Sequence, residues 1–270
     1  MNPRPKPKLL ALDLDGTLIG RDLQIRPRVL QAVAAARSAG ITGCIVTGRM
    51  FQATLPFARQ IEFDQPIICY QGAAIVDPSS DEVLQHVGVE SPLVLEISKR
   101  VLEDGMHLQL YANDQFYVEA ENEFSELYAR LSGVRPVRVD SLLEEFRFRD
   151  ATKIVVIDRP ERAQAYAETL RSLFGDRAYI TRSFPEFIEI LNQNVDKGQA
   201  LRFVATRAGI DREAVVAIGD SWNDVPLLRA AGFGIAMSSS PPELLEVADA
   251  IVPDVLHDGV AEAIDRFVIA

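Results

Sequence analysis

The sequence is poor in cysteine and has no long apolar run. Only 2 of its 270 residues are cysteines, Cys44 and Cys69, and both lie in short apolar segments. We expect both to be reduced core residues, and neither a disulfide nor a metal site is indicated. No apolar run reaches the roughly 20 residues that span a bilayer, and the basic N-terminus precedes too short an apolar segment for a signal peptide. These absences predict a cytoplasmic protein without a membrane partner.

Positive charge is also scarce, because 28 lysines and arginines stand against 39 acidic residues and the net charge is −11. A broad basic surface for nucleic acid is therefore not expected. An anionic substrate would be repelled at long range, so any phosphate site must be made positive locally by a metal ion, a lysine and backbone N–H groups. The hydrophobic content of 48% is typical of a globular protein with an ample core.

Both ends of the chain alternate between short apolar strands and amphipathic helices. We expect strands at 9–12, 41–46, 66–70, 214–218, 232–237 and 248–252. We expect helices at 26–40, 50–60, 200–208 and 226–231. This alternation predicts an α/β fold with a doubly wound parallel sheet.

Between these stretches the pattern changes to hairpins mixed with helices. Strands are expected at 108–111, 116–119, 153–157, 178–181 and 187–191, and helices at 93–103, 124–131 and 163–174. Such a mixture predicts a separate α+β unit inserted at a surface loop. We therefore expect a core domain formed by 1–86 and 188–270, with an inserted domain at 87–187.

Two carboxylates follow the first expected strand. Asp13 and Asp15 are separated only by Leu14, so strand alternation places them on the same face. Gly16 allows a tight turn after them. Like charges this close are unfavourable unless a cation lies between them, and Mg²⁺ accepts carboxylate and carbonyl oxygens together with substrate phosphate. A solvated acidic turn is the alternative to a metal site.

Polar residues gather at three further strand ends or helix starts. Thr47 and Gly48 offer a hydroxyl and close backbone N–H groups, although an ordinary helix N-cap would have the same sequence. Lys197 lies in the first turn of an expected helix, where the dipole disfavours positive charge. Taken alone, it is more simply interpreted as a solvent-exposed lysine. The segment after the strand at 214–218 carries Asp220, Asn223 and Asp224.

These four motifs, in this order, resemble those of the haloacid dehalogenase (HAD) superfamily of phosphohydrolases. They read Asp-Leu-Asp-Gly-Thr at 13–17, Thr-Gly-Arg at 47–49, Lys-Gly at 197–198 and Gly-Asp-x-x-Asn-Asp at 219–224. The long insert between the second and third motifs is similar to the cap of the Cof-type branch. The resemblance covers essentially the whole chain and implies a Rossmann-like core with an inserted α+β cap domain. Members near this branch often have Asn where Gln71 stands.

The resemblance also implies a role for each matching position. Asp13 would be the nucleophile and Asp15 the general acid/base, with Thr47 and Lys197 completing the catalytic set. The substrate-binding set would be Leu14, Thr47, Gly48, Arg49, Lys197 and Asn223. Mg²⁺ would be held by Asp13, the Asp15 backbone carbonyl and Asp220, with Asp224 supporting it from behind or through water.

The implied activity is an Mg²⁺-dependent phosphomonoesterase that hydrolyses small phosphorylated metabolites, such as sugar phosphates or phosphorylated cofactors, through an aspartyl phosphate. The chemistry of the residues agrees, since charge neutralisation and positioning dominate phosphoryl transfer. The expected assembly is a monomer or homodimer. Two alternatives keep the fold: a phosphomutase, and a receiver-like regulatory module phosphorylated on Asp13. No GxGxxG motif follows the first strand, which disfavours a dinucleotide-binding domain.

The cap would shield the site from water and contact the leaving group. The aromatic residues that could form a wall of the site are Tyr111, Phe116, Tyr117, Phe184 and Phe187. Aromatic residues in strands are nevertheless more often part of a core. Arg49 and Arg182 could meet a second anionic group of the substrate, or could equally lie on the surface.

Overall fold

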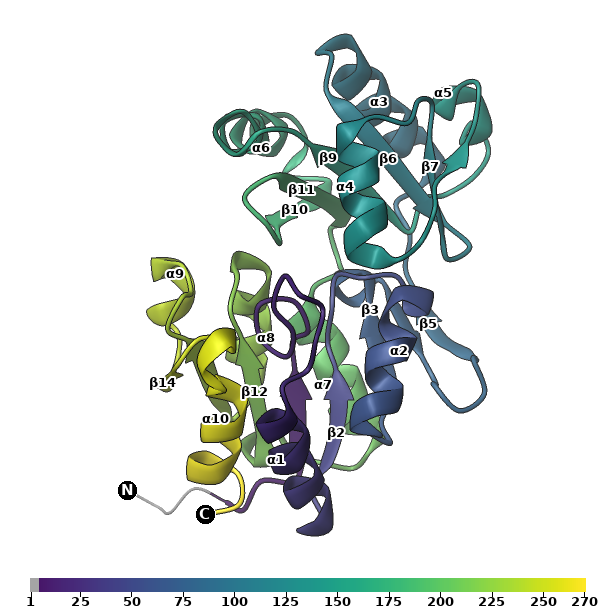
Figure 1. Ribbon diagram of the computed structural model, residues 1–270. Coiled ribbons are helices and arrows are strands. Elements are labelled where there is room, and N and C mark those ends of the chain that lie inside the picture. The colour runs from purple at the N-terminus through teal and green to yellow at the C-terminus, as the bar shows by residue number, and fades with distance from the viewer. Residues whose placement is uncertain (1–4) are drawn as a thin grey trace. The chain divides into compact units, whose positions relative to one another are not determined.

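The computed structural model describes residues 5–270, and the chain divides into two compact units. We call them the core unit and the cap unit. The core unit comprises Met1–Gly48, Thr54–Leu84 and Asp196–Ala270, and the cap unit comprises Arg49–Ala53 and Gln85–Val195. The cap unit thus extends through Val195, whereas the predicted insert ends at 187. Figure 1 labels the elements of both units.

A five-stranded parallel sheet forms the centre of the core unit, in the order β14-β13-β12-β1-β2. Its strands are β1 (Leu9–Leu12), β2 (Thr42–Ile45), β12 (Val215–Gly219), β13 (Phe233–Met237) and β14 (Ala250–Val252). Leu9 of β1 pairs with Val215 on one side and Thr42 on the other. Every residue of β1 is fully buried, as an apolar strand between two neighbours should be.

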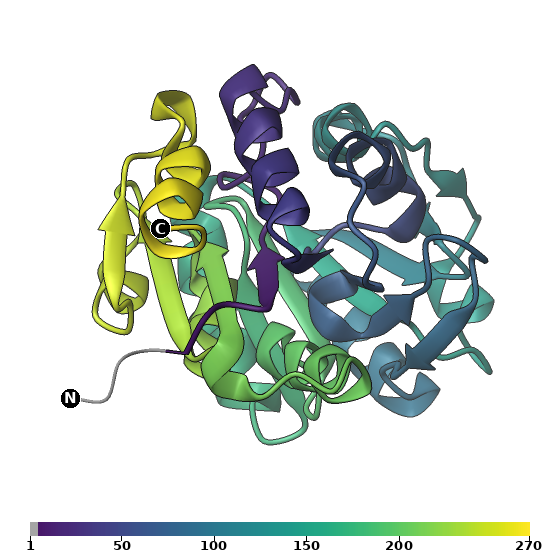
Figure 2. The same ribbon diagram turned by 90° about the horizontal axis from the view of Figure 1, so that it is seen from below.

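Helices cover both faces of this sheet, which confirms the predicted doubly wound α/β fold. Figure 2 shows α1 and α10 on one face and α7 and α8 on the other. The helices are α1 (Pro27–Ser38), α2 (Phe51–Ile61), α7 (Lys197–Arg207), α8 (Val225–Ala230), α9 (Pro242–Leu245) and α10 (Gly259–Phe267). Leu201 and Val204 of α7 pack with Leu9 of β1 in one buried cluster. Helices α9 and α10 were not predicted from the sequence.

A small antiparallel sheet follows α2. It contains β3 (Ile67–Cys69), β4 (Ala74–Val76) and β5 (Val83–His86), and a 3₁₀ turn at Tyr70–Gly72 joins the first two strands. A parallel bridge between Val46 and Ile68 links β3 to the chain that continues from β2. The 3₁₀ turn is thereby held beside the carboxyl end of the main sheet.

The cap unit is built on a six-stranded sheet in the order β10-β11-β9-β6-β7-β8, antiparallel except for the pair β7 and β8. Its strands are β6 (His107–Ala112), β7 (Gln115–Val118), β8 (Val137–Arg138), β9 (Lys153–Ile157), β10 (Ala178–Arg182) and β11 (Phe187–Asn192). Its helices are α3 (Ser91–Glu103), α4 (Glu123–Ser132), α5 (Leu142–Glu145) and α6 (Pro160–Phe174). This mixture of hairpins and helices agrees with the predicted α+β insert.

Alternate residues of the cap sheet pack in two different clusters, one on each face of the sheet. Ile154 and Val156 of β9 belong to an apolar core with residues of α3 and α6, such as Ile97 and Leu170. Helix α4 packs against the other cluster, because the centroid of its Tyr128 ring lies 4.9 Å from that of Phe116, which is fully buried. Four of the five candidate wall aromatics are buried, as core residues are: Tyr111, Phe116, Tyr117 and Phe187.

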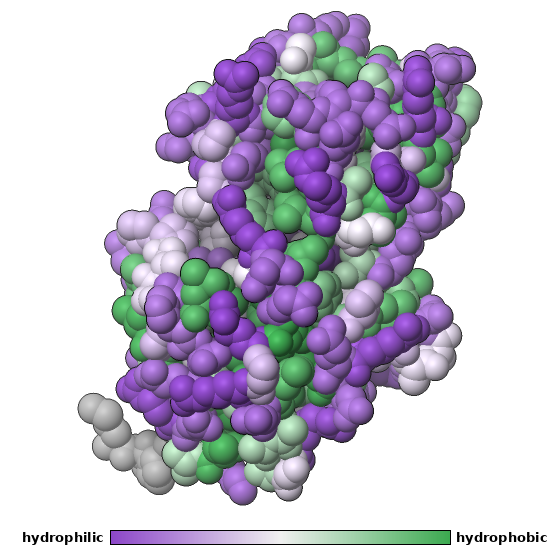
Figure 3. Space-filling view, viewed as in Figure 1, coloured by the Kyte–Doolittle hydropathy of each residue, from purple (hydrophilic) through white to green (hydrophobic). Residues whose placement is uncertain are grey.

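In the described part of the chain, large apolar side chains such as Phe148 and Leu256 are exposed at only a few positions. On the face seen in Figure 3, hydrophilic residues predominate and hydrophobic ones are scattered between them. Among residues 5–270, no helix combines the length and the apolar character that a membrane-spanning segment requires.

Candidate active site

Three loops of the core unit start side by side at the carboxyl edge of the parallel sheet. The Asp13 backbone N–H donates to the carbonyl of Ile218 (3.0 Å), and the Val46 N–H donates to the carbonyl of Leu12 (2.9 Å). The ends of β12, β1 and β2 are therefore in register. Ligands of open α/β sheets bind at this edge, and three of the four predicted motifs begin there.

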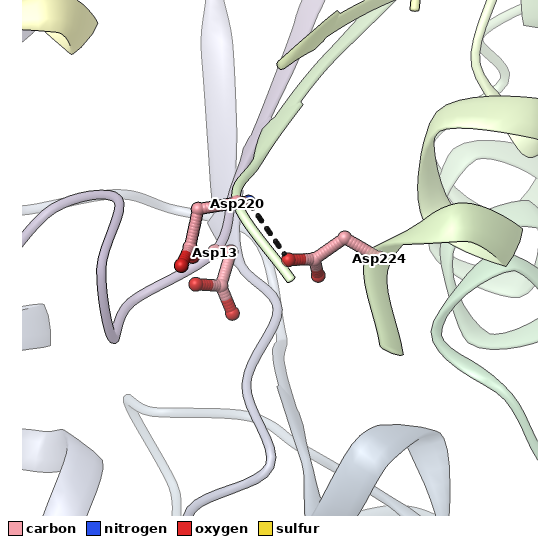
Figure 4. Close-up of side chains that lie close together, drawn as sticks. All are labelled: Asp13, Asp220 and Asp224. Atoms are coloured by element: carbon pink, nitrogen blue, oxygen red, sulfur yellow. Dashed lines mark hydrogen bonds between the residues drawn. The ribbon is translucent and has the colours of Figure 1, made fainter. Parts of the chain in front are cut away.

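Three carboxylates gather at this edge, as Figure 4 shows. One oxygen from each of Asp13, Asp220 and Asp224 lies within 4.8 Å of the other two. Asp13 follows β1, Asp220 follows β12, and Asp224 lies one turn further along the chain. A side chain on Gly16, whose φ is +86°, would collide with the Asp220 carboxylate. The glycine of the first motif is thus needed both for its backbone conformation and for its lack of a side chain.

Lys197 joins two of these carboxylates. Its Nζ lies 2.5 Å from an Asp13 oxygen and 2.6 Å from an Asp224 oxygen. The lysine side chain is only 1% exposed, so the interpretation as a solvent-exposed residue is wrong. Asp196 caps the helix by accepting the Gln199 backbone N–H (2.7 Å), and this places Lys197 at the first position of α7. The unfavourable placement against the helix dipole is offset by two buried ion pairs.

Burial and crowding shift the pKa values of these groups. Burial and then the charge of Asp224 raise the pKa of Asp13 to about 7, against the opposing effect of Lys197. Burial and the charges of Asp13 and Asp224 also hold the pKa of Asp220 well above its usual range. Burial alone would lower the pKa of Lys197, but its two carboxylate partners outweigh burial and raise that pKa. The lysine is therefore a permanent cation of this cluster.

Asp224 is held by the protein on both oxygens. One oxygen accepts Lys197, and the other accepts the backbone N–H groups of Asp220 and Ser221, both at 3.0 Å. Asp220 in turn accepts the Thr17 hydroxyl (3.0 Å). Asp224 thus fixes the loop after β12, while Asp13 and Asp220 present carboxylate oxygens beside it. Thr17 and Ser221 were not among the predicted site residues. The Thr17 contact depends on which loops meet in space, because Asp220 lies 203 positions further along the chain.

Gln71 connects the second and fourth motifs, because it contacts both Thr47 and Asn223. Thr47 is 1% exposed and Asn223 is 5% exposed. The Asn223 side chain donates to Oε1 of Gln71 (2.9 Å), and the Gln71 backbone N–H donates to the carbonyl of Thr47 (3.0 Å). The core unit therefore brings Asp13, Thr47, Gly48, Lys197, Asp220, Asn223 and Asp224 to one edge of its sheet.

Three other predicted residues have a different placement. Leu14 is fully buried, and its carbonyl accepts the N–H groups of Leu18 and Ile19 (both 2.9 Å), so any contact of Leu14 with a substrate would involve its backbone. Asp15 is partly exposed, and its carboxylate is outside the three-carboxylate cluster. Arg49 is buried and belongs to the cap unit.

The carboxylate cluster fits a hard divalent cation. Three carboxylates face one ammonium group, which leaves excess negative charge in a buried place. Carboxylate oxygens are the ligands that Mg²⁺ and Ca²⁺ prefer, and a bound cation reverses the conditions that raise the pKa of Asp13 and Asp220. Asp13 and Asp220 are the better ligands of the three, since both oxygens of Asp224 already accept hydrogen bonds from the protein.

The sequence matches a known protein family. The sequence model of the haloacid dehalogenase-like hydrolases matches residues 10–264. The chain belongs to this family. The predicted Cof-type haloacid dehalogenase-like hydrolase is confirmed, and so is the predicted enzyme class, a phosphatase of this family. Hydrolases of this family use a divalent metal, in agreement with the Asp cluster.

Relatives and solved structures match along nearly the full length. A phosphoglycolate phosphatase of Methanothermobacter thermautotrophicus is 28% identical, with 96% of this chain and 98% of that protein covered. A pyridoxal phosphate phosphatase of Escherichia coli is 27% identical, with 95% and 97% covered. The crystal structure of a Thermotoga maritima protein is 30% identical and has a TM-score of 0.81, with 97% of each chain covered. The two named phosphatases act on different substrates, so the family does not fix the substrate.

Proposed function

We propose that this HAD-like hydrolase is an Mg²⁺-dependent phosphomonoesterase that hydrolyses small phosphorylated metabolites through an aspartyl phosphate on Asp13. The observation that carries the proposal is the Lys197 ammonium bridging Asp13 and Asp224 inside the three-carboxylate cluster. The lysine is one fixed cation beside the Asp13 carboxylate, and the surplus negative charge of the cluster would suit a divalent metal ion. Relatives named for phosphoglycolate and pyridoxal phosphate support small phosphorylated metabolites as the substrate class.

Mg²⁺ would be held by the Asp13 and Asp220 carboxylates and the Asp15 carbonyl, with Asp224 fixing the loop behind them. The chemistry that Mg²⁺ supplies when bound is charge neutralisation, which lets an anionic carboxylate approach an anionic phosphate. The Lys197 ammonium and the Thr47 hydroxyl, together with the Gly48 N–H, bind the equatorial oxygens of the transferred group. These donors are fixed before substrate arrives, so they stabilise the transition state without reorganisation.

The reaction then proceeds in two steps on the chain's own residues. An Asp13 oxygen forms a bond to phosphorus as the ester P–O bond breaks, and Asp15 donates a proton to the leaving alkoxide. Asp15 next takes a proton from water, which attacks phosphorus and breaks the bond to Asp13. Inorganic phosphate and the free Asp13 carboxylate result, so the enzyme returns to its starting state.

The experiment is phosphate release from p-nitrophenyl phosphate and a panel of metabolite phosphates, with Mg²⁺ and with EDTA. We expect Mg²⁺-dependent release, and the ranking of the panel would begin to identify the substrate. Transfer of the phosphoryl group to a second hydroxyl, instead of to water, would show a phosphomutase. No release from any ester, with a phosphoenzyme that persists for hours, would contradict the proposal and favour a regulatory module.

A further inference from the structure

Gln71 is a fully buried polar residue that the reaction described above does not use. It lies in the 3₁₀ turn at Tyr70–Gly72, where its backbone has φ 59° and ψ 19°. This left-handed conformation is uncommon for a residue other than glycine, and such strain concentrates at functional sites. Its N–H is bonded to the carbonyl of Thr47 (3.0 Å), so the strained turn is fastened to the second motif.

The Gln71 side chain forms half of a buried carboxamide pair. Asn223 donates from Nδ2 to Oε1 of Gln71 at 2.9 Å. Within residues 5–270, neither Nε2 of Gln71 nor Oδ1 of Asn223 has a hydrogen-bond partner, although both atoms are buried. Turning both carboxamides over would exchange the bonded atoms and still leave one NH₂ group and one oxygen unpaired. The pair therefore keeps a donor for a further ligand.

The same carboxamide lies directly on Gly48. A Cβ atom built at Gly48 would collide with the terminal amide of Gln71. The Gln71 side chain thus extends from Gly48 to Asn223, two residues expected to contact the transferred phosphoryl group. An anionic oxygen would satisfy such an unpaired donor, and hydrogen bonds to charged acceptors are the stronger ones.

We propose that Gln71 is a positioning residue of the phosphoryl site, which orients the Asn223 carboxamide and through this pair offers one additional N–H donor to a phosphoryl oxygen. The inference rests on the proposed phosphatase function. Glutamine suits this turn because its side chain is long enough to reach Asn223 across Gly48.

The test compares Gln71→Leu and Gln71→Glu with the parent enzyme. Leucine removes the carboxamide at similar volume, and glutamate keeps an acceptor for Asn223 while replacing the NH₂ group by oxygen. With p-nitrophenyl phosphate as substrate and orthovanadate as inhibitor, we expect Gln71→Leu to lower kcat/KM and raise the vanadate Ki by about tenfold each. Gln71→Glu should raise the Ki by about a hundredfold, because its carboxylate also repels the anion.

Gln65→Leu is the matched control, because Gln65 bonds Thr42 (3.0 Å) on β2, whose opposite end leads into the site. We expect its kinetics to equal those of the parent. A double-mutant cycle with Asn223→Ala should be strongly non-additive in kcat/KM if Gln71 acts through Asn223.

Two results would overturn the inference. One is an active parent whose Gln71→Leu and Gln71→Glu variants keep the parental Ki and kcat/KM, even if their melting temperatures fall, because a purely structural role would do the same. The other is an additive cycle with Asn223→Ala. A parent that neither hydrolyses p-nitrophenyl phosphate nor binds orthovanadate would instead remove the proposed function, and this inference with it.

Discussion

At the scale of single residues, Lys197 is the clearest case of function overriding local preference. A lysine at the first position of a helix is disfavoured by the dipole, and a buried lysine is costly unless it is paired. Here its Nζ has two carboxylate partners at 2.5 and 2.6 Å. The sequence shows the unfavourable lysine at the helix start. It does not show which residues pair with that lysine, because Asp13 is 184 positions away.

Replacing that lysine tests the charge balance of the cluster. Lys197→Met should leave three buried carboxylates without an ammonium group, and breaking buried pairs costs about 3–5 kcal/mol. We expect this loss in urea unfolding measured in EDTA, and a smaller loss with Mg²⁺ present. The matched control is Lys99→Met, since Lys99 is 70% exposed and should have almost no effect. Parental stability of Lys197→Met in EDTA would contradict the ion-pair account.

His107 of the cap unit is a second residue whose surroundings dictate its charge. Burial lowers its pKa to about 4. The Nδ1 atom of His107 lies 3.1 Å from Nδ2 of Asn122, whose Oδ1 accepts the Phe124 N–H. A proton on Nδ1 would set two donors against each other. The folded protein thus keeps this histidine neutral.

The pH dependence of stability follows from that shift. An unfolded histidine takes up a proton near pH 6.5, whereas the folded one does so only near pH 4, so protonation favours unfolding as the pH falls between these values. Between pH 7 and pH 5, the free energy of unfolding should fall by about 2 kcal/mol less in His107→Gln than in the parent. The exposed His257 supplies the control, His257→Gln. Equal losses for parent and His107→Gln would argue against a buried neutral histidine.

At the scale of elements, buried apolar strands and long amphipathic helices were predictable, and most short elements with few buried residues were not. The central helices and strands agree with the sequence analysis within a few residues, because a buried strand such as β1 is uniformly apolar. The strands β5 and β8 and the helices α5 and α9 have two to four residues each, too few for a period to appear. Helix α10 was missed although Val260 and Ile264 show helical spacing.

The cap sheet contains an ion pair that can be tested as a property of two neighbouring strands. Lys153 of β9 lies 2.8 Å from Glu189 of β11, and their side chains are 2% and 3% exposed. Lys153→Met should destabilise by about 3 kcal/mol, whereas the double variant with Glu189→Leu should recover most of that loss. Urea unfolding of the four proteins measures the coupling. Simple addition of the two single effects would show that the pair is not coupled.

At the scale of the whole molecule, the sequence established the family and not the substrate. Motif residues are short-range signals at strand ends, so Asp13, Thr47 and Asp220 could be named from the sequence. The contacts of Gln71 with Gly48 and Asn223 could not, because they join three loops far apart in the chain. Side chains that recognise a leaving group follow no common pattern, as the differently named phosphatase relatives illustrate.

Metal binding should register in the stability of the whole chain. A cation that binds only the folded state raises its stability by about 2.7 kcal/mol at a hundred times its dissociation constant. We expect a saturable rise in melting temperature with Mg²⁺, which Asp220→Asn should abolish. Asp265→Asn is the control, because that carboxylate is 50% exposed and remote from the cluster. The same rise in Asp220→Asn as in the parent would place the cation elsewhere.

The most direct test of the proposed activity is the covalent state of Asp13. Asp15→Asn should still transfer the phosphoryl group from p-nitrophenyl phosphate but hydrolyse the intermediate slowly, because the general base is lost. Mass spectrometry of this variant after rapid quenching should find one phosphoryl group on the peptide that contains Asp13, and none when Asp13→Asn is added. Phosphate release by the parent without any such adduct in Asp15→Asn, or with undiminished turnover in Asp13→Asn, would contradict the aspartyl phosphate on Asp13.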